Sequence, residues 1–303
     1  MKEYTTKDIR NVVLLGASKS GKTSLAESVL YVGKVIDRKG TVEDKNTVSD
    51  YEEIEKLNQR SVYATPVYAE FANAKVNVID APGSDDFCGG AFSAFKVCEN
   101  GILTVNAQQG VEVGTNIFER YASKAKLPLV IAVNQLDAEK ADWELVQNSL
   151  KESFGNKIIN IQFPASVGAG FDGFVDVLTM KYYHFTDDKG TREDLEIPAQ
   201  FADEAQILRE ALSELRRQIH FEPIGFELLP EKFSMKSLQH LYEAILGVRF
   251  DRRNFYNKML HLGILNQVEG ETIRESQKRD AFLYTFNKDS YDEMKKKGFR
   301  LEF

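Results

Sequence analysis

The chain has 303 residues, of which 43% are hydrophobic and 28% are charged, a composition typical of a soluble globular protein with room for two domains. It contains no run of 18 apolar residues, and its polar first ten residues lack the apolar stretch of a secretory signal, so neither a membrane protein nor an exported one is expected. Two cysteines, Cys88 and Cys98, are too few for a disulfide scaffold and form a poor metal site by themselves, which favours a reducing, cytoplasmic location.

The net charge of −7 is unevenly distributed along the chain. Residues 216–303 hold 16 Lys and Arg against 13 Asp and Glu, so this tail is slightly basic and the remainder carries the acidic excess. Such an asymmetry indicates two modules with different partners.

The first 180 residues alternate strand-like and helix-like segments. Residues 11–16 (NVVLLG) form a short apolar run typical of a buried strand, and residues 22–33 carry apolar side chains at helical spacing. Residues 67–80 predict a hairpin that turns near Asn73 and whose second strand ends at Asp80.

Two further buried strands are predicted at residues 100–107 and 127–137, with helical stretches between and after them. This alternation predicts an α/β fold in which helices cover both faces of a mainly parallel sheet. Ligands of such sheets bind beyond the carboxyl ends of the strands. Residues 34–59 are charged and lack a clean period, so we expect a mobile loop there, at the place of a switch region.

The pattern changes after Pro198. Residues 199–221 predict one long amphipathic helix, which a proline-bearing connection follows. The segments 234–247 and 251–265 then predict a helix, a turn and a second helix, and residues 281–299 a strand and a last short helix.

A glycine-rich stretch between the first strand and the first helix, GASKSGKT, matches the phosphate-binding P-loop pattern in full. Its glycines let the backbone wrap around phosphates, its amides point inward at the helix N-terminus, the lysine would reach the β- and γ-phosphates, and the threonine would ligate magnesium. The predicted nucleotide-binding residues of this stretch are Gly16, Ala17, Ser18, Lys19, Ser20, Gly21, Lys22 and Thr23.

Two further motifs follow in order. Asp80 would hold magnesium, and the amide of Gly83 would meet the γ-phosphate. In NQLD, which follows a buried strand, Asn134, Gln135 and Asp137 would contact the base, because a carboxylate at Asp137 can accept both N–H groups of guanine. The three motifs together predict binding of GTP or GDP with Mg²⁺, whereas NQLD alone is also compatible with an ordinary turn.

Residues 1 to about 209 resemble the G domain of elongation factor G, of the divergent kind found in Bacteroidetes. The stretches 14–51, 77–90 and 110–137 carry this resemblance. It implies a translational GTPase whose partner is the ribosome, and it places the residues from about 160 in an insert within the G domain. The four domains that follow the G domain in that family have no counterpart in this sequence.

Four positions depart from that family. Ser84 stands at the catalytic position, where the family has a histidine that positions the attacking water, and Tyr63 stands at the switch I threonine that ligates magnesium. Gln135 replaces the lysine of the base motif, and Lys19 replaces a frequent aspartate. We therefore expect impaired hydrolysis, unless Lys19 or Asp85 compensates.

The stretch FPASVGAGFDGFVDVL allows two interpretations. Its distance from NQLD suits the serine-alanine loop that small GTPases place around the guanine oxygen, with Ser166 as the contact. The resemblance to elongation factor G instead places this stretch at the start of the insert, and this second interpretation is favoured.

Residues 210–303 resemble a different family, the C-terminal winged-helix domain of Nudix-related transcriptional regulators. The resemblance implies binding to duplex DNA, and the start of the second helix offers suitable side chains: Arg252, Arg253, Asn254 and Lys258. The alternative is a helical packing module with a solvated charged face. We hypothesise that the chain is a chimera of the two families, either recombined or engineered. Its seam would lie near residues 209–215, inside one continuous helix. Such a chimera would have the complete activity of neither family.

Overall fold

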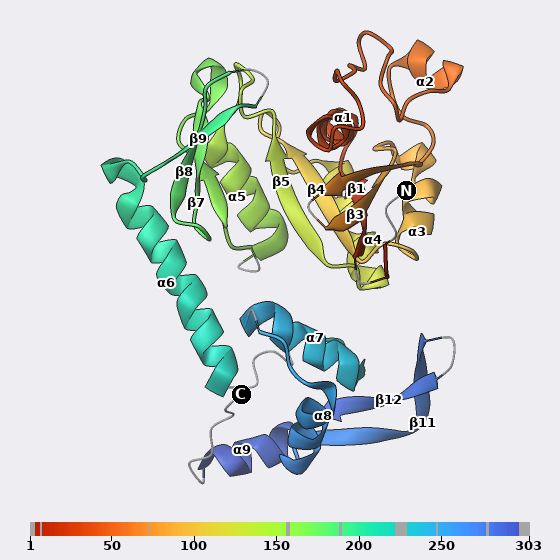
Figure 1. The fold of residues 1–303 in the computed structure, drawn as a ribbon, viewed down its shortest axis with the longest axis vertical. Helices are drawn as coiled ribbons and strands as arrows, with labels where there is room; N and C mark the ends of the chain where they lie inside the picture. Colours follow the sequence, from red (N-terminus) through yellow and green to blue (C-terminus); the bar gives the residue numbers. More distant parts are fainter. Residues whose placement is uncertain are drawn as a thin grey trace. The chain divides into compact units, whose positions relative to one another are not determined.

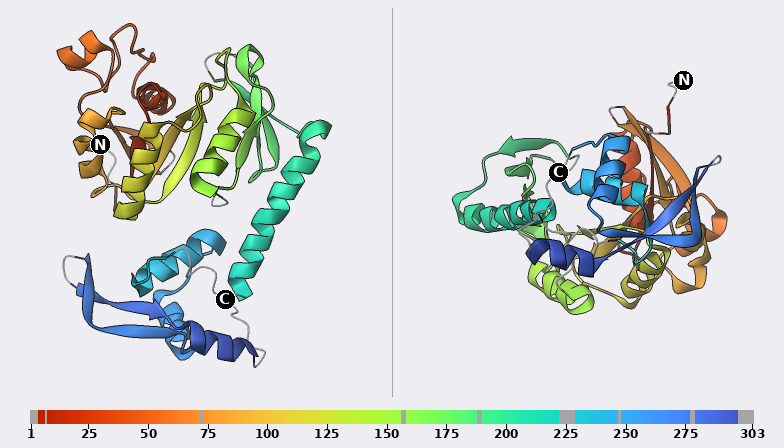
Figure 2. Two further views of the ribbon diagram at one scale, coloured as in Figure 1. Left: turned by 180° about the vertical axis from the view of Figure 1, so that it is seen from behind. Right: turned by 90° about the horizontal axis from the view of Figure 1, so that it is seen from below.

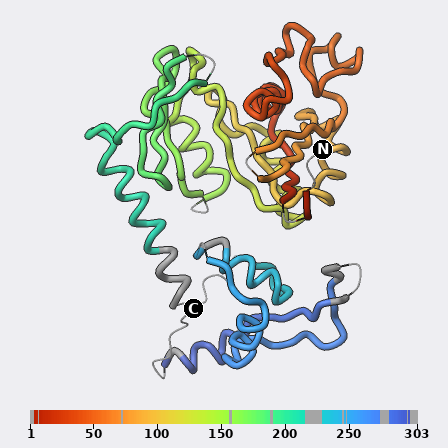
Figure 3. Tube along the Cα trace, in the orientation of Figure 1, coloured from red at the N-terminus to blue at the C-terminus, as the bar shows by residue number. Residues whose placement is uncertain are grey.

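The computed structural model describes residues 4–6, 8–71, 73–155, 158–187, 190–221, 229–246, 248–276 and 279–296. Figure 3 shows the trace of the chain. Two compact units form, residues 1–201 and 202–303. Each is described by itself below.

The first unit is built on a five-stranded sheet (Figure 1). Its strands lie in the order β2-β3-β1-β4-β5, in which β2 is antiparallel to β3 and all other neighbours are parallel. The bounds are Ile9–Leu15 for β1, Thr65–Phe71 for β2, Ala74–Asp80 for β3, Asn100–Asn106 for β4 and Leu129–Asn134 for β5. The predicted hairpin around Asn73 and the mainly parallel sheet are confirmed.

Successive side chains of a strand point to opposite faces of the sheet, so these apolar strands present apolar side chains on both faces. Helices cover both faces. Leu14 of β1 packs with Leu30 of α1 on one face, whereas Val13 and Leu15 pack with Phe118 of α4 on the other. The helices α3 and α5 also lie on the second face. Ala91 and Ala94 of α3 and Val146 and Leu150 of α5 are buried there. The helix bounds are Lys22–Val32 for α1, Gly89–Ala94 for α3, Val113–Ala125 for α4 and Trp143–Phe154 for α5.

The segment 34–59, expected to be a loop, contains a helix. Glu53–Asn58 form α2, which a capping box opens: the Glu52 side chain accepts from the backbone at Glu55, and the Glu55 side chain accepts from the Glu52 amide. Glu55 is buried, so the capping interaction also fixes this segment in place. The expectation of an irregular segment is therefore wrong for these six residues.

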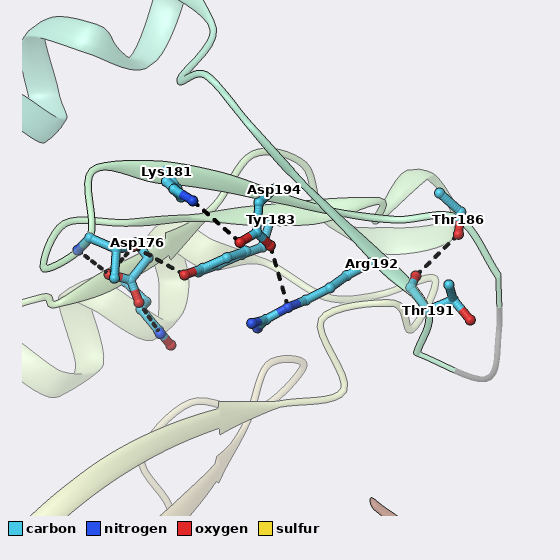
Figure 4. Close-up of polar contacts among 9 residues, drawn as sticks. Asp176, Lys181, Tyr183, Thr186, Thr191, Arg192 and Asp194 are labelled. Atoms are coloured by element: carbon cyan, nitrogen blue, oxygen red, sulfur yellow. Dashed lines mark hydrogen bonds and ion pairs between the residues drawn. The ribbon is translucent and has the colours of Figure 1, made fainter.

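A second sheet, which the sequence analysis does not predict, follows α5. It contains β6 (Gln162–Pro164), β7 (Gly173–Asp176), β8 (Lys181–Phe185) and β9 (Arg192–Leu195) in this order, all antiparallel. Figure 4 shows how Asp194 of β9 forms ion pairs with Lys181 at 3.4 Å and with Arg192 at 3.6 Å. The buried Asp176 at the end of β7 accepts hydrogen bonds from Gln162 and Thr179.

The second unit holds most of α6 (Ala199–Phe221), followed by β10 (Phe233–Ser234), α7 (Met235–Leu246), α8 (Arg252–His261), β11 (Leu265–Ser276), β12 (Arg279–Phe286) and α9 (Lys288–Lys296). The predicted helix over 199–221 is confirmed, and it runs without a break through the proposed seam at 209–215. The strand β11 was not predicted. It pairs antiparallel with β12, and β12 also pairs antiparallel with β10, so this unit has a three-stranded sheet in the order β10-β12-β11. Figure 2 shows the long hairpin of β11 and β12 in blue.

This unit has its own core, with Phe233, Leu238, Tyr242, Met259 and Tyr284 among its buried members. Phe255 and Met259, four residues apart on α8, are both buried in this core. Among the helices of the described residues, none is both long and apolar enough to cross a membrane.

Candidate functional site

The loop between β1 and α1 has the backbone of an anion-binding nest. Gly16, Lys19 and Gly21 adopt positive φ values of 133°, 64° and 91°. A side chain on Gly16 would collide with the carbonyl of Thr104, so only glycine fits there. Of the predicted residues in this loop, Ser18 and Lys19 are exposed, Gly21 is half-buried, and the others are buried: Gly16, Ala17, Ser20, Lys22 and Thr23.

Lys22 lies at the centre of this loop with only 5% of its surface exposed. Its ammonium donates to the carbonyl oxygens of Gly16 at 3.0 Å and Ala17 at 2.8 Å. Burial lowers the pKa of Lys22 to about 8, while the nearby carboxylates of Asp80 and Asp50 act in the opposite direction. A buried cation among amides and carbonyls is suited to bind a phosphate.

Thr23 and Asp80 meet at the ends of α1 and β3. The Thr23 hydroxyl donates to Asp80 Oδ2 at 2.8 Å, and the Ser49 hydroxyl donates to the same oxygen at 2.7 Å. Burial raises the pKa of Asp80, and its other oxygen, Oδ1, is buried without a hydrogen-bond partner among the described residues. An orphaned carboxylate oxygen beside a hydroxyl fits Mg²⁺, which prefers oxygen ligands and keeps several waters.

The metal would depend on the phosphates for further ligands. Within the described part of the chain, no group of three or more His, Cys, Asp or Glu side chains could hold a metal ion alone. The pair Thr23 and Asp80 therefore fits a metal that arrives with a nucleotide, as the sequence predicts.

Gly83 brings the segment after β3 against the P-loop. A side chain at Gly83 would meet the backbone of Ala17 and the ammonium of Lys22. Ser84 follows as the half-buried cap of a short 3-10 helix, Asp85–Phe87, and Asp85 itself is exposed. Ser84 therefore lies one residue beyond the contact of Gly83 with the P-loop.

The loop after β5 is joined to the P-loop by two side-chain amides. Asn134 Nδ2 donates to the Ser20 carbonyl at 3.1 Å, and Gln135 Nε2 donates to the Lys19 carbonyl at 3.1 Å. Asn106, at the end of β4, donates to Gln135 Oε1 at 2.9 Å. Asp137 is exposed at the end of this loop.

Ser166 lies at the start of the second sheet. It follows β6, which pairs with β7 and not with β5, and its hydroxyl donates to Gly170 O at 2.6 Å and Asp172 Oδ1 at 3.0 Å. The same turn contacts the base loop, because the Gly168 amide donates to Leu136 O at 2.7 Å. The sheet topology agrees with the interpretation that this stretch opens an insert.

The sequence analysis did not identify the polar residues of segment 34–64 that lie near Thr23 and Asp80. Ser61 Oγ lies 3.2 Å from Thr23 Oγ1, and Asp50 is 4% exposed beside Asp80. Tyr63, which occupies the switch I threonine position, is instead 54% exposed. No local sequence signal separates Ser49, Asp50 and Ser61 from other polar loop residues, so only the fold could identify them.

The N-terminal turn of α8 carries the predicted DNA-contacting side chains on its surface. Arg252, Arg253, Asn254 and Lys258 are all exposed. Asp251 caps this helix by accepting from the Asn254 amide at 2.9 Å, which fixes the helix start. The arrangement of β10, two helices and the β11–β12 hairpin, with β10 paired to β12, is that of a winged helix.

Two family models match the chain. The elongation factor Tu GTP-binding domain matches residues 7–250, and the NrtR DNA-binding winged-helix domain matches residues 225–286. The two matches overlap within residues 225–250. A single chain therefore carries both kinds of module, as the two sequence resemblances imply.

Similar proteins include an elongation factor G-like protein of Thermotoga maritima, 33% identical over 227 residues, and elongation factor G of Mycoplasma genitalium, 31% identical over 209 residues. These alignments cover 73% and 69% of this chain but only 32% and 30% of the relatives. A solved structure from Thermus thermophilus superposes with a TM-score of 0.67 at 27% identity, over 84% of this chain and 39% of that one. The chain thus spans about a third of the length of the curated relatives it matches.

Proposed function

Because the chain belongs to the elongation factor Tu GTP-binding domain family, we propose that its first unit binds GTP and GDP with Mg²⁺ and hydrolyses GTP slowly. The observation that carries this proposal is the meeting of three elements at one edge of the sheet. The P-loop with its buried Lys22, the Thr23–Asp80 pair and the Asn134 loop are joined by hydrogen bonds.

Phosphate binding follows from the P-loop. Its amides, held by the positive φ values of Gly16, Lys19 and Gly21, and the Lys22 ammonium would cradle the β-phosphate at the N-terminus of α1. Thr23 and Asp80 would hold Mg²⁺, which neutralises charge on the phosphate oxygens when it is bound. The Gly83 amide is placed beside the same point by its close packing on Ala17.

Guanine selectivity would come from Asp137. A carboxylate accepts from two N–H groups, which guanine offers side by side on its pairing edge and adenine does not. Asn134 and Gln135 act differently in this structure, since both hold the P-loop carbonyls and so fix the distance between the base and phosphate sites.

Slow hydrolysis rests on two side chains. Ser84 is too short and lacks the cationic form of the histidine that the elongation factor G family uses, and Tyr63 is 54% exposed. Phosphoryl transfer depends on positioning and on charge stabilisation, and loss of one such element costs on the order of 10²–10³ in rate. The elongation factor G family also suggests the ribosome as a partner of this unit.

Isothermal titration of GDP, GTP and ADP into the full chain with Mg²⁺ tests this proposal. We expect binding of both guanine nucleotides and none of ADP. Asp137→Asn should weaken GDP binding and favour xanthosine diphosphate, because the amide offers a donor where the carboxylate offered an acceptor. Equal affinity of the wild type for ADP and GDP would contradict guanine selectivity, and loss of GDP binding in Lys22→Ala would support the P-loop assignment.

A second function, binding of duplex DNA, is favoured by the match of residues 225–286 to a DNA-binding winged helix and by the exposed cations of α8. Such contacts would go mainly to phosphates and position α8 without reading sequence by themselves. The alternative of a packing module predicts no shift of any duplex at low salt.

The union of the two modules in one chain also supports our hypothesis of a recombined or engineered chimera. The predicted domain limits of 1–209 and 210–303 remain a proposal, with the seam inside α6. Sequencing of the intact gene in its source is the decisive measurement.

A further inference from the structure

The loop that carries Asp137, residues 135–139, is held from two sides. On one side, Gln135 Nε2 donates to the Lys19 carbonyl of the P-loop at 3.1 Å. On the other side, the amide of Gly168, in the turn after β6, donates to the Leu136 carbonyl at 2.7 Å. Leu136 directly precedes Asp137, so this second contact acts on the peptide that carries the proposed guanine ligand.

A cavity lies beside this loop. Its volume is about 640 Å³, and it is lined by residues 129–137 together with Phe171, Phe174 and Phe185, among others. Side chains that pack closely limit how far a loop can move, and a cavity removes that restraint. The position of the loop therefore depends more on its hydrogen bonds, of which the contact from Gly168 is one.

Gly168 is suited to this contact by its backbone conformation. It is buried, and its φ of 77° lies in the left-handed region that favours glycine. A Cβ atom at this position would lie 3.7 Å from the carbonyl oxygens of Ala138 and Glu139, which is an ordinary contact distance. An alanine would therefore fit in the available space, but it would strain the backbone that directs the amide at Leu136.

The turn itself is fixed to β8 by Asp172. The Oδ1 atom of Asp172 accepts from the Tyr182 hydroxyl at 3.0 Å and lies 3.0 Å from Ser166 Oγ. Its Oδ2 atom lies 3.9 Å from His184 Nδ1. Ser166 and Asp172 flank Gly168 in the sequence, and Tyr182 and His184 belong to β8. The strand thus sets the position of the turn, and the turn sets the position of the loop.

We propose that the turn 166–172, held by Asp172 and Tyr182, positions Asp137 for guanine and so contributes to the selectivity for this base. The inference rests on the proposed nucleotide binding and deepens it. A loop that is already in place before the ligand arrives loses less conformational entropy on binding. Ser166 then acts within the turn and not on the base, because its hydroxyl is directed to Gly170 and Asp172.

The turn should matter for the base and not for the phosphates. Asn134 and Gln135 reach the P-loop carbonyls, whereas Gly168 contacts the residue next to Asp137. Loosening of the turn therefore weakens the bonds of Asp137 to guanine and leaves the phosphate site in place. Inosine diphosphate separates the two contributions, because its base lacks the 2-amino group and offers Asp137 a single N–H.

The test compares the affinities of the full chain for GDP, inosine diphosphate and inorganic pyrophosphate, by titration calorimetry with Mg²⁺. For Gly168→Ala we expect GDP affinity to fall about 3- to 10-fold and the ratio of GDP to inosine diphosphate affinity to fall about threefold, the effect of about one hydrogen bond. Pyrophosphate affinity should not change. Gly190→Ala is the matched control, because Gly190 has a φ of 86° in the turn between β8 and β9 and a Cβ there would have no atom within 4 Å. It should change none of the three affinities.

Tyr182→Phe is a second, milder variant. It removes the hydroxyl that Asp172 accepts and should lower the ratio of GDP to inosine diphosphate affinity by about twofold. Tyr183→Phe makes the same change at the next residue, whose hydroxyl lies 3.2 Å from Thr179 Oγ1 and not at the turn (Figure 4). This control should leave the ratio unchanged.

A folded Gly168→Ala variant with the wild-type ratio would overturn the inference, and so would one that loses GDP and pyrophosphate affinity by the same factor. If Gly168→Ala does not fold, a wild-type ratio in Tyr182→Phe overturns it instead. Equal affinity of the wild type for GDP and inosine diphosphate would contradict the role of Asp137 on which the inference rests. No binding of GDP by the wild type would overturn the proposed function, and the inference with it.

Discussion

Asn134 Nδ2 donates to the carbonyl oxygen of Ser20 at 3.1 Å, which joins the loop after β5 to the loop after β1 across 114 residues of sequence. Gln135 repeats the connection to Lys19 at 3.1 Å. The loop that would bind the base therefore also stabilises the loop that would bind the phosphates.

The first prediction concerns this link. Asn134→Ala should weaken GDP binding by about 2- to 10-fold, which corresponds to the net loss of one hydrogen bond of about 0.5–1.5 kcal/mol. Because the P-loop is affected, binding of inorganic pyrophosphate, which has no base, should weaken as well. Titration calorimetry with both ligands checks this, and an Asn134→Ala variant with unchanged pyrophosphate affinity would contradict the structural link.

The second prediction concerns hydrolysis. We expect wild-type turnover of bound GTP to be slow, and Ser84→His to increase single-turnover phosphate release, because the imidazole can reach and orient the attacking water. Ser84→Ala is the matched control and should give no increase. If histidine brings no gain, the defect lies elsewhere, for example at Tyr63. Fast release by the wild type would instead point to compensation by Lys19 or Asp85.

The third prediction concerns the exposed start of α8. Arg252→Ala and Arg253→Ala should each weaken binding of duplex DNA and reduce the slope of affinity against salt by about one unit, since each removes one phosphate contact. Glu293→Gln, on the exposed part of α9, is a control that should leave the slope unchanged. A wild-type chain that shifts no duplex at low salt would favour the packing module.

The fourth prediction is a pH dependence of stability without nucleotide. Burial raises the pKa of Asp50 from 3.8 to about 6, with Asp80 and Glu55 acting in the same direction and Lys22 against it. The folded state therefore binds more protons at Asp50 than the unfolded state between about pH 4 and pH 6, and stability is lost as the pH rises through that window.

Asp50→Asn removes this dependence. The wild type loses stability as the pH rises from 4 to 7, and the variant does not lose this part. The free energy of unfolding of the variant, relative to that of the wild type, should therefore rise over this pH range by on the order of 1–3 kcal/mol. Urea denaturation of the EDTA-treated protein at several pH values measures the difference. A difference that is independent of pH would show that Asp50 does not titrate in this range.

The sequence by itself determined the order of the motifs and the elements that carry them. GASKSGKT, Asp80 and NQLD each follow an apolar run long enough to be recognised as a buried strand, and the parallel arrangement of β1, β3, β4 and β5 then brings their carboxyl ends together. The helix over 199–221 was predicted with the bounds that the structure shows, because its apolar stripe continues along its whole length.

Only the tertiary structure decided the four-stranded sheet and the identity of the polar residues around the metal position. Strands such as β6 and β7 have three and four residues, too few for a period to be distinguished from a loop. Asp50 and Ser61 lie in a stretch of ordinary polar composition. They become candidate site residues only through contacts between distant parts of the chain. Ser49 contacts Asp80, 31 positions away, and Ser61 contacts Thr23, 38 positions away. Such contacts are set by how the chain packs, because burial and the need to satisfy each buried polar atom act between segments that no local pattern connects.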